Sequence, residues 1–439
     1  MADLFAGKIA ENQMRLGECI AEIRALPGFE SFMGPPNWDD VATVLDRDSA
    51  TEPAADVLLY LAVTASGGVA LIISERVQQA VFLDRLDMEM LSRIFSKHGY
   101  AAVQRDDNDA IAALSRTMGW LCEAVMDPIR PALSALFDAQ DKAVPRRMLL
   151  IPSGPLSILP LHACQLSPGG EGDTLLERFV VQYGLSAITW RHCRRIASDR
   201  RDASPSVLAV GNPHPLHDGY DDLLGAEAEA EAVALKFGEA AILLCGRAAT
   251  NEAVEEQLAR FSYLHFACHG TFDIEHPSES SLLLGNGELS LIHLIVRGER
   301  IPARLVVMSA CQTALVDLQR YPEEPVGLPA GFVEAGSPAA IGTFWSIDDV
   351  PTALLVDHLY NLLLEPQQPE LRPTPAEALR RAQIWLRGVT RQEVEQYLRE
   401  SVIGQRLAAK IPDIRIRGAP FERPFEHPIY WAPFSFHGA

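Results

Sequence analysis

A histidine and a cysteine follow two apolar segments of similar design. Residues 263–267 lead through Cys268 into His269, and residues 305–310 lead into Cys311, 42 positions after the histidine. A thiol of ordinary pKa, near 8.5, is only slightly ionised at neutral pH, and a neighbouring imidazole can take its proton. The two side chains would therefore act as nucleophile and general base if the fold brings them together.

The separation of the two segments leaves room for the crossover of a βαβ unit. Such a unit would make them neighbouring parallel strands whose ends share one edge of a sheet. Gly270 lacks a Cβ, so its N–H could approach an oxygen that becomes negative during acyl transfer, and the N–H of Cys311 is a second candidate donor. Spacing alone balances this interpretation against a buried structural thiol near a strand-end histidine.

A metal site is a third interpretation, because His265, Cys268 and His269 stand close together in the sequence. Consecutive strand residues face opposite sides of a sheet, so these side chains cannot converge on one ion. We therefore expect neither a metal nor an organic cofactor. The chain's 7 cysteines form no CxxC pair, which favours a reducing, cytoplasmic location.

The surrounding pattern predicts an α/β fold with a mostly parallel sheet flanked by helices. Residues 1–55 are expected to form a helical appendage, 56–140 a β-meander with helices that pack on the core, and 141–439 the main domain. The meander strands are predicted at 57–63, 69–73 and 77–83, and the sheet strands at 148–151, 180–183, 207–210, 241–244, 263–267, 305–309 and 339–344. A helix is predicted at 226–237, with the charges of Glu227, Glu229 and Glu231 facing solvent.

Charge and composition exclude several classes of partner. The net charge of −20 argues against direct nucleic-acid binding, which draws its affinity from clustered Lys and Arg. No apolar run approaches the ~20 residues that span a bilayer, and the N-terminus lacks a charged-then-apolar leader, so we expect no membrane partner. The 48% hydrophobic and 22% charged residues are typical of a globular chain.

Several sequence blocks resemble the CHAT-domain peptidases, which are relatives of caspases and separases. They are HFACHG (265–270), SACQTA (309–314), IGTFWSIDD (341–349) and HPIYWAPF (427–434), with LLIPSGPLSILPLHA (149–163), LLGAEAEAEAV (223–233) and TPAEALRRAQ (374–383) in the family's order. The resemblance implies a caspase-like sheet with a His-Cys dyad at His269 and Cys311 and an oxyanion donor at Gly270. It also divides 141–439 into a pseudo-peptidase-like half, 141–240, and a catalytic half, 241–439.

Two acidic residues follow Trp345 in the third of these blocks. Asp348 and Asp349 resemble the separase stretch that lines a pocket for a basic side chain, and Asp349 is the closer match. A carboxylate there would bond Arg or Lys of a substrate. The sequence supports equally well a helix cap at Asp348, before Val350 and Pro351.

The resemblance implies a cysteine endopeptidase that cleaves a specific protein substrate. Family members commonly belong to bacterial signalling or defence systems and stay inactive until a partner or ligand arrives. Control by a protein that docks on residues 1–140, or by self-association, is the corresponding expectation. One alternative is a catalytically idle scaffold that binds a partner, and another is a nucleotide-binding α/β domain.

Overall fold

The computed structural model describes most of the chain. The residues described are 14–15, 17–27, 34, 37–45, 54–64, 66–104, 109–136, 145–166, 173–217, 219–271, 280–296, 300–309, 327–364, 372–411 and 413–439. Two compact units are distinguished, Met1–Thr43 and Val44–Ala439. The finer domain boundaries expected from the sequence stay predictions. Among the described helices, none combines the length and the apolar character needed to cross a membrane.

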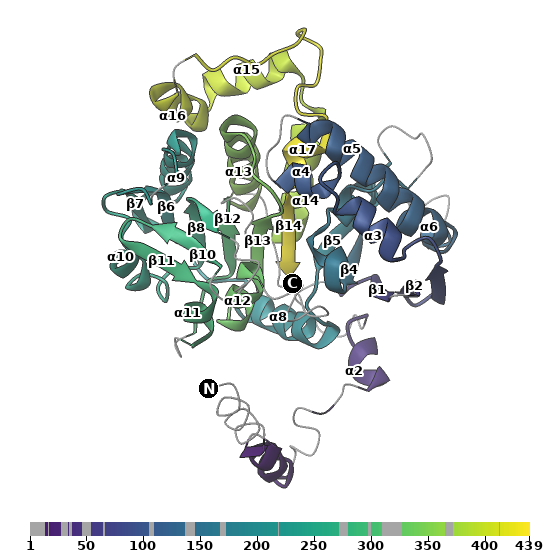
Figure 1. The fold of residues 1–439 in the computed structure, drawn as a ribbon. Helices are drawn as coiled ribbons and strands as arrows, with labels where there is room; N and C mark the ends of the chain where they lie inside the picture. Colours follow the sequence, from purple (N-terminus) through teal and green to yellow (C-terminus); the bar gives the residue numbers. More distant parts are fainter. Residues whose placement is uncertain are drawn as a thin grey trace, which may run out of the picture. The chain divides into compact units, whose positions relative to one another are not determined.

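One large sheet forms the centre of the second unit (Figure 1). Its eleven described strands follow the order β3-β2-β1-β4-β5-β14-β13-β12-β8-β6-β7. Their bounds are β1 Val57–Thr64, β2 Gly67–Ile73, β3 Gln78–Leu83, β4 Arg146–Pro152, β5 Phe179–Tyr183, β6 Val207–Pro213, β7 Ala241–Gly246, β8 Tyr263–Ala267, β12 Leu305–Met308, β13 Ala339–Thr343 and β14 Phe434–Gly438. A smaller sheet joins β9 Gly270–Thr271, β10 Ser281–Leu284 and β11 Gly287–Ser290.

The predicted strands are confirmed, and so is the parallel character of most of the sheet. The meander β1–β3 is antiparallel, and β1 continues into the main sheet by pairing in parallel with β4. The sequence analysis missed β14, which enters the sheet antiparallel to β13 and parallel to β5. The meander and the main region therefore share one continuous sheet.

Helices cover both faces of this sheet. Their bounds are α2 Trp38–Ala42, α3 Met88–Ile94, α4 Tyr100–Gln104, α5 Ala110–Leu121, α6 Asp127–Ser134, α7 Leu175–Arg178, α8 Ala187–Asp199, α9 Leu224–Phe237, α10 Asn251–Glu255, α11 Leu291–Val296, α12 Leu328–Glu334, α13 Asp349–Leu364, α14 Pro375–Gly388, α15 Arg391–Glu400, α16 Val402–Lys410 and α17 Pro428–Trp431. A π-helical turn, Cys122–Met126, joins α5 to α6.

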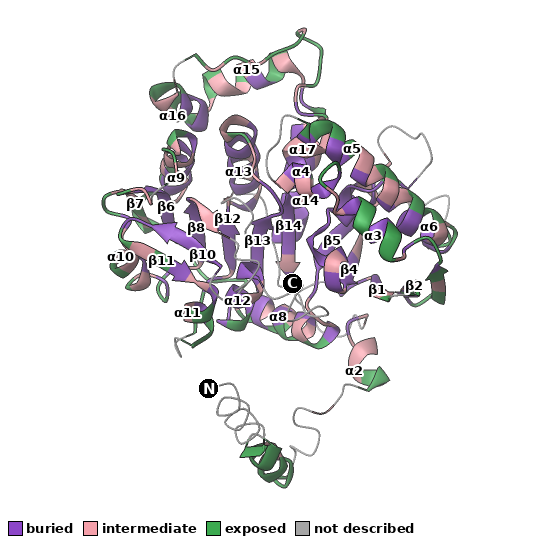
Figure 2. Cartoon of the chain, viewed as in Figure 1, coloured by how far each residue is buried: buried purple, intermediate pink, exposed green. Residues whose placement is uncertain are grey.

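Alternate residues of the parallel strands enter two separate cores, as strands buried on both faces require. Val307 of β12 belongs to the core beneath α9, α13 and α14, whereas Val306 and Met308 belong to the core beneath α11 and α12. Figure 2 shows the central strands as buried and much of α15 and α16 as intermediate or exposed. The sheet is therefore a rigid support for residues at its strand ends.

The segment 327–332 differs from the expectation of an activation loop. It begins α12, and the ring of Phe332 packs against that of Phe266 in β8 with centroids 5.8 Å apart. Because its apolar side chains are buried beneath the sheet, this segment belongs to the core.

Candidate active site at the ends of two parallel strands

His269 lies just beyond the carboxyl end of β8, between the main sheet and β9. Its side chain is partly buried, and its backbone carbonyl accepts a hydrogen bond from the N–H of Leu283 in β10, 2.9 Å away. The residue is thus held on both sides by strands. This is the edge of an open α/β sheet at which functional groups collect.

The imidazole of His269 is oriented by the backbone of a neighbouring loop. Its Nε2 lies 2.8 Å from the carbonyl oxygen of Asp221, and its ring packs against that of Tyr220 with centroids 4.7 Å apart. A carbonyl oxygen can only accept, so Nε2 must carry the proton of this hydrogen bond. In the neutral ring, Nδ1 is then the nitrogen with a lone pair free to accept a proton.

The loop that presents Asp221 connects β6 to α9 and is tied down by polar contacts. Asn212, with φ of 45°, accepts from the N–H of Leu223 at 3.0 Å and donates to the Asp222 carboxylate at 3.3 Å. His214 Nε2 lies 2.8 Å from the same carboxylate. His217 Nε2 lies 2.8 Å from the carbonyl of Leu284 in β10. These contacts give the Asp221 carbonyl a fixed place beside His269.

The strands that precede the two candidate catalytic residues are parallel neighbours, as predicted. Leu305 pairs with Tyr263 and Met308 pairs with Phe266, and the N–H of Ser309 donates to the Phe266 carbonyl at 3.0 Å. His269 is three positions after Phe266, and Cys311 is three positions after Met308. Cys311 lies outside the described residues, so its contact with His269 stays a prediction.

Ladder geometry determines the direction of the Gly270 N–H. Gly270 is opposite Leu282, and the flanking bond from the Leu283 N–H goes to the His269 carbonyl. This makes Gly270 and Leu282 a non-hydrogen-bonded pair of the antiparallel ladder. The N–H of Gly270 therefore points away from β10.

Asp348 and Asp349 occupy different environments at the start of α13. Asp348 is exposed, and its carbonyl accepts the first helical bond, from the Thr352 N–H at 3.2 Å. Asp349 is partly buried, and its carboxylate accepts from the Gly225 N–H in the first turn of α9 at 3.2 Å. Burial raises the pKa of the Asp349 carboxyl, the Gly225 bond opposes this, and the charges of Glu229 and Asp348 reinforce it. Both residues therefore lie next to the helix that follows the Asp221 loop.

A buried polar group of three side chains was not predicted. Glu229 of α9 is 2% exposed and lies 3.1 Å from Nε2 of His265, which is 0% exposed. The hydroxyl of Ser309, at the end of β12, donates to Glu229 Oε1 at 2.5 Å. The expectation that Glu229 faces solvent is wrong. Glu227 and Glu231 stand four residues apart and share one helix face, so Glu229, midway between them, must point the opposite way.

Free thiols occur at six described positions, Cys19, Cys122, Cys164, Cys193, Cys245 and Cys268. A hydrogen bond from Cys164 lowers the pKa of the Cys122 thiol to about 7. Burial raises the pKa of Cys193 and of Cys245 to about 12. Among these six, Cys122 is therefore the one whose pKa favours a reactive thiolate at neutral pH.

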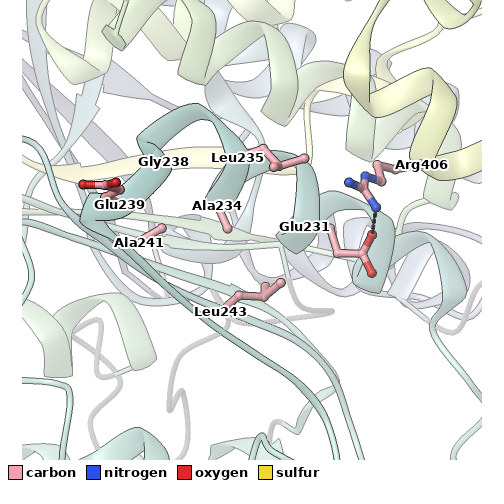
Figure 3. Close-up of a pocket in the computed structure, with 8 residues that line it drawn as sticks. All are labelled: Glu231, Ala234, Leu235, Gly238, Glu239, Ala241, Leu243 and Arg406. Atoms are coloured by element: carbon pink, nitrogen blue, oxygen red, sulfur yellow. Dashed lines mark hydrogen bonds and ion pairs between the residues drawn. The ribbon is translucent and has the colours of Figure 1, made fainter.

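A surface pocket of about 590 Å³ lies beside the second half of α9, the edge strand β7 and Arg406 (Figure 3). Its walls include Leu235 and Leu243, together with Glu231, which forms an ion pair with Arg406 at 3.1 Å. His269 contacts the loop before the opposite end of α9. The pocket is therefore separate from the candidate active site.

Comparison with known proteins agrees with this architecture. A family model described as the CHAT domain matches residues 115–439. No curated protein sequence matches the chain. A chain of the Saccharomyces cerevisiae separase-securin complex shares 9% identity and a TM-score of 0.54, over 91% of this chain and 30% of that chain. The Arg-specific cysteine proteinase gingipain R shares 11% identity and a TM-score of 0.45, over 72% and 67% of the two chains.

The separase likeness, at so low an identity, concerns the fold alone, and this chain spans less than a third of that one. The fold is caspase-like, with a large and mostly parallel sheet flanked by helices. Since the family model covers well over half of the sequence, the chain belongs to the CHAT-domain family.

Proposed function

We propose that this protein is a cysteine endopeptidase in which His269 is the general base and Cys311 the nucleophile. The observation that carries the proposal is the register of β8 and β12, which leaves His269 and Cys311 equally far beyond one pair of neighbours. Two residues extend at most about 7 Å, so the chain allows little distance between Ser309 and Cys311. The bond from Nε2 to the Asp221 carbonyl supports the role of Nδ1 as the base.

In the proposed reaction, Nδ1 of His269 takes the proton of the Cys311 thiol, and the thiolate attacks the carbonyl carbon of the scissile peptide. The oxygen of that carbonyl becomes negative and is stabilised by the N–H groups of Gly270 and Cys311. The protonated imidazole then gives its proton to the leaving amine. Water, deprotonated by the same imidazole, hydrolyses the thioester and frees the enzyme.

A preference for Arg or Lys before the cleaved bond is the proposed role of Asp348 and Asp349. The exposure of Asp348 supports direct contact with a substrate. The bond from Gly225 to Asp349 supports a role for Asp349 in fixing the start of α9, beside the substrate path. Peptide-library profiling should show Arg or Lys enrichment that Asp348→Asn reduces. An apolar preference that neither Asp348→Asn nor Asp349→Ala alters would refute this specificity.

We further propose a role in bacterial signalling or defence, in the cytoplasm, under the control of a protein partner. Six free thiols among the described residues are compatible with a reducing compartment. A surface for a partner within residues 56–140 is supported by the outer face of β2 and β3, where Leu71 is 40% and Phe82 75% exposed. Phe82→Glu should abolish activation by such a partner without changing basal labelling of Cys311.

The experiment that tests the proposal is labelling with a peptidyl electrophile that carries Arg next to its reactive carbon. A Cys122→Ser background removes the described thiol with a lowered pKa. The label should reside on Cys311, identified by mass spectrometry, and His269→Ala should abolish it. Incubation of the protein and its Cys311→Ala variant with candidate substrate proteins should yield new termini only with the intact thiol.

Labelling also distinguishes the endopeptidase from a catalytically idle scaffold. A scaffold would leave Cys311 no more reactive than the other thiols, and His269→Ala would make no difference. Either result would refute the endopeptidase.

A further inference from the structure

The buried group of Glu229, His265 and Ser309 joins three elements beneath the candidate site. Glu229 comes from α9, His265 from β8 and Ser309 from the end of β12. The first two are almost wholly buried, and neither ring nitrogen of His265 makes a hydrogen bond of good geometry within the described residues. A carboxylate buried in this way is costly unless its partners compensate. Its retention therefore calls for a role.

The other two glutamates of the same helix supply the contrast. Glu227 lies 2.7 Å from Lys410, and Glu231 lies 3.1 Å from Arg406 and 3.3 Å from Lys410, on the face of α9 that meets α16. These pairs are partly exposed and hold one helix to another. Glu229 instead faces the sheet and takes the Ser309 hydroxyl, so its contact is with the last described residue before the Cys311 segment.

Ser309 is held from two sides. Its N–H continues the ladder to the Phe266 carbonyl at 3.0 Å, and its hydroxyl bonds Glu229 at 2.5 Å. The ladder bond fixes the height of Ser309 along β8. The Glu229 bond fixes the side of the sheet toward which Ser309 turns, and with it the direction in which the chain departs. A charge-assisted bond of this kind is among the stronger ones available to a hydroxyl.

We infer that Glu229 and Ser309 are positioning residues that aim the nucleophile segment at His269. This inference rests on the proposed endopeptidase function. The bond between them connects the end of β12 to α9, and the loop just before α9 presents the Asp221 carbonyl to His269. One helix thus orients the base through its preceding loop and the nucleophile strand through its buried carboxylate.

The surroundings of Glu229 allow this contact to dominate. The titratable groups around it are His265 on β8 and, on α13, Asp349 and Tyr360, whose charges interact with it. The ring of Tyr360 packs edge-on against that of His265, with centroids 5.6 Å apart, and its hydroxyl has no hydrogen-bond partner within the described part of the chain. No Lys or Arg ion pair to Glu229 is found among the described residues, so Ser309 and His265 are the polar contacts that hold it.

The test is the pH profile of Cys311 alkylation by iodoacetamide in the Cys122→Ser background. An aimed Cys311 shares a proton with His269 and reacts well below the ordinary thiol pKa. Ser309→Ala should move the midpoint of the profile upward by at least one pH unit, toward about 8.5, which lowers the rate at pH 6.5 by at least about tenfold. Ser309→Thr keeps the hydroxyl and should restore the wild-type profile. Glu231→Gln, a matched change on the same helix, should leave it unchanged.

The second variant, Glu229→Gln, keeps an acceptor for Ser309 but removes its charge, and should produce a smaller shift in the same direction. Combined with Ser309→Ala it should add nothing further, because both changes break one bond. A wild-type profile in folded Ser309→Ala would overturn the positioning role while leaving the endopeptidase intact. A wild-type protein in which Cys311 shows no preferential reactivity would refute the proposed function itself.

Discussion

Asn212 offers a sharp test of how the site is built, because it carries the loop that orients His269. Replacement by Ala removes two hydrogen bonds, to the Leu223 N–H and the Asp222 carboxylate, at about 1 kcal/mol each. It also places Ala at a φ of 45°, which costs about 1 kcal/mol more. Asn212→Ala should therefore lower the free energy of unfolding by about 3 kcal/mol.

Asn212→Gly is the matched control, because glycine accepts the positive φ but cannot restore the bonds. Its loss of stability should be about 2 kcal/mol in denaturant titrations. Peptidase turnover should fall in both variants by a similar factor, up to roughly 30-fold if the 2 kcal/mol of lost bonds reside in loop alignment. Turnover within twofold of wild type in both variants, or restored by Gly, would refute the link between this loop and His269.

Three further predictions concern the base, a buried histidine and a close helix contact. His269→Ala should reduce peptide turnover by about 10²–10⁴-fold with an unchanged melting temperature, and a loss below tenfold would contradict its role as general base. Burial, reinforced by the charge of His437, lowers the pKa of His162 to about 3, so its stabilising contribution is present above pH 6.5 and declines as the pH falls toward 3. At pH 5 the wild type should have lost about 2 kcal/mol more than His162→Phe, and parallel denaturation profiles would contradict this. Gly225→Ala would place a Cβ 2.4 Å from that of Asp349 and should cost about 1–3 kcal/mol, whereas Gly119→Ala, with nothing within 4 Å, should cost nothing.

The strands were predictable because each carries a compact apolar or β-branched run. The same reasoning missed β14, whose residues Phe434–Gly438 alternate apolar with Ser435 and His437. Its place between β13 and β5 depends on contacts with residues distant in sequence, which local propensity does not encode. Segment 327–332 was expected as a loop because of its glycines and proline, although Pro in a first helical turn also favours the helix observed.

The candidate site was predictable only where side-chain identity carries the signal. His269 and Gly270 were recognisable at a strand end, and the parallel pairing of β8 with β12 followed from their spacing. The contribution of Asp221 is a backbone carbonyl, which leaves no trace in residue type. Glu229 had a readable signal, since an i, i+4 pair on one helix face sends the residue midway between them to the other.

The most direct test of the central claim is a crystal structure of the protein joined to a peptidyl electrophile. We predict a covalent bond from the sulfur of Cys311, with Nδ1 of His269 within hydrogen-bond reach of the reacting centre, about 2.6–3.2 Å, and Nε2 still on the Asp221 carbonyl. A structure in which the thiol and the imidazole face different interiors, with the electrophile attached to another cysteine, would contradict the account.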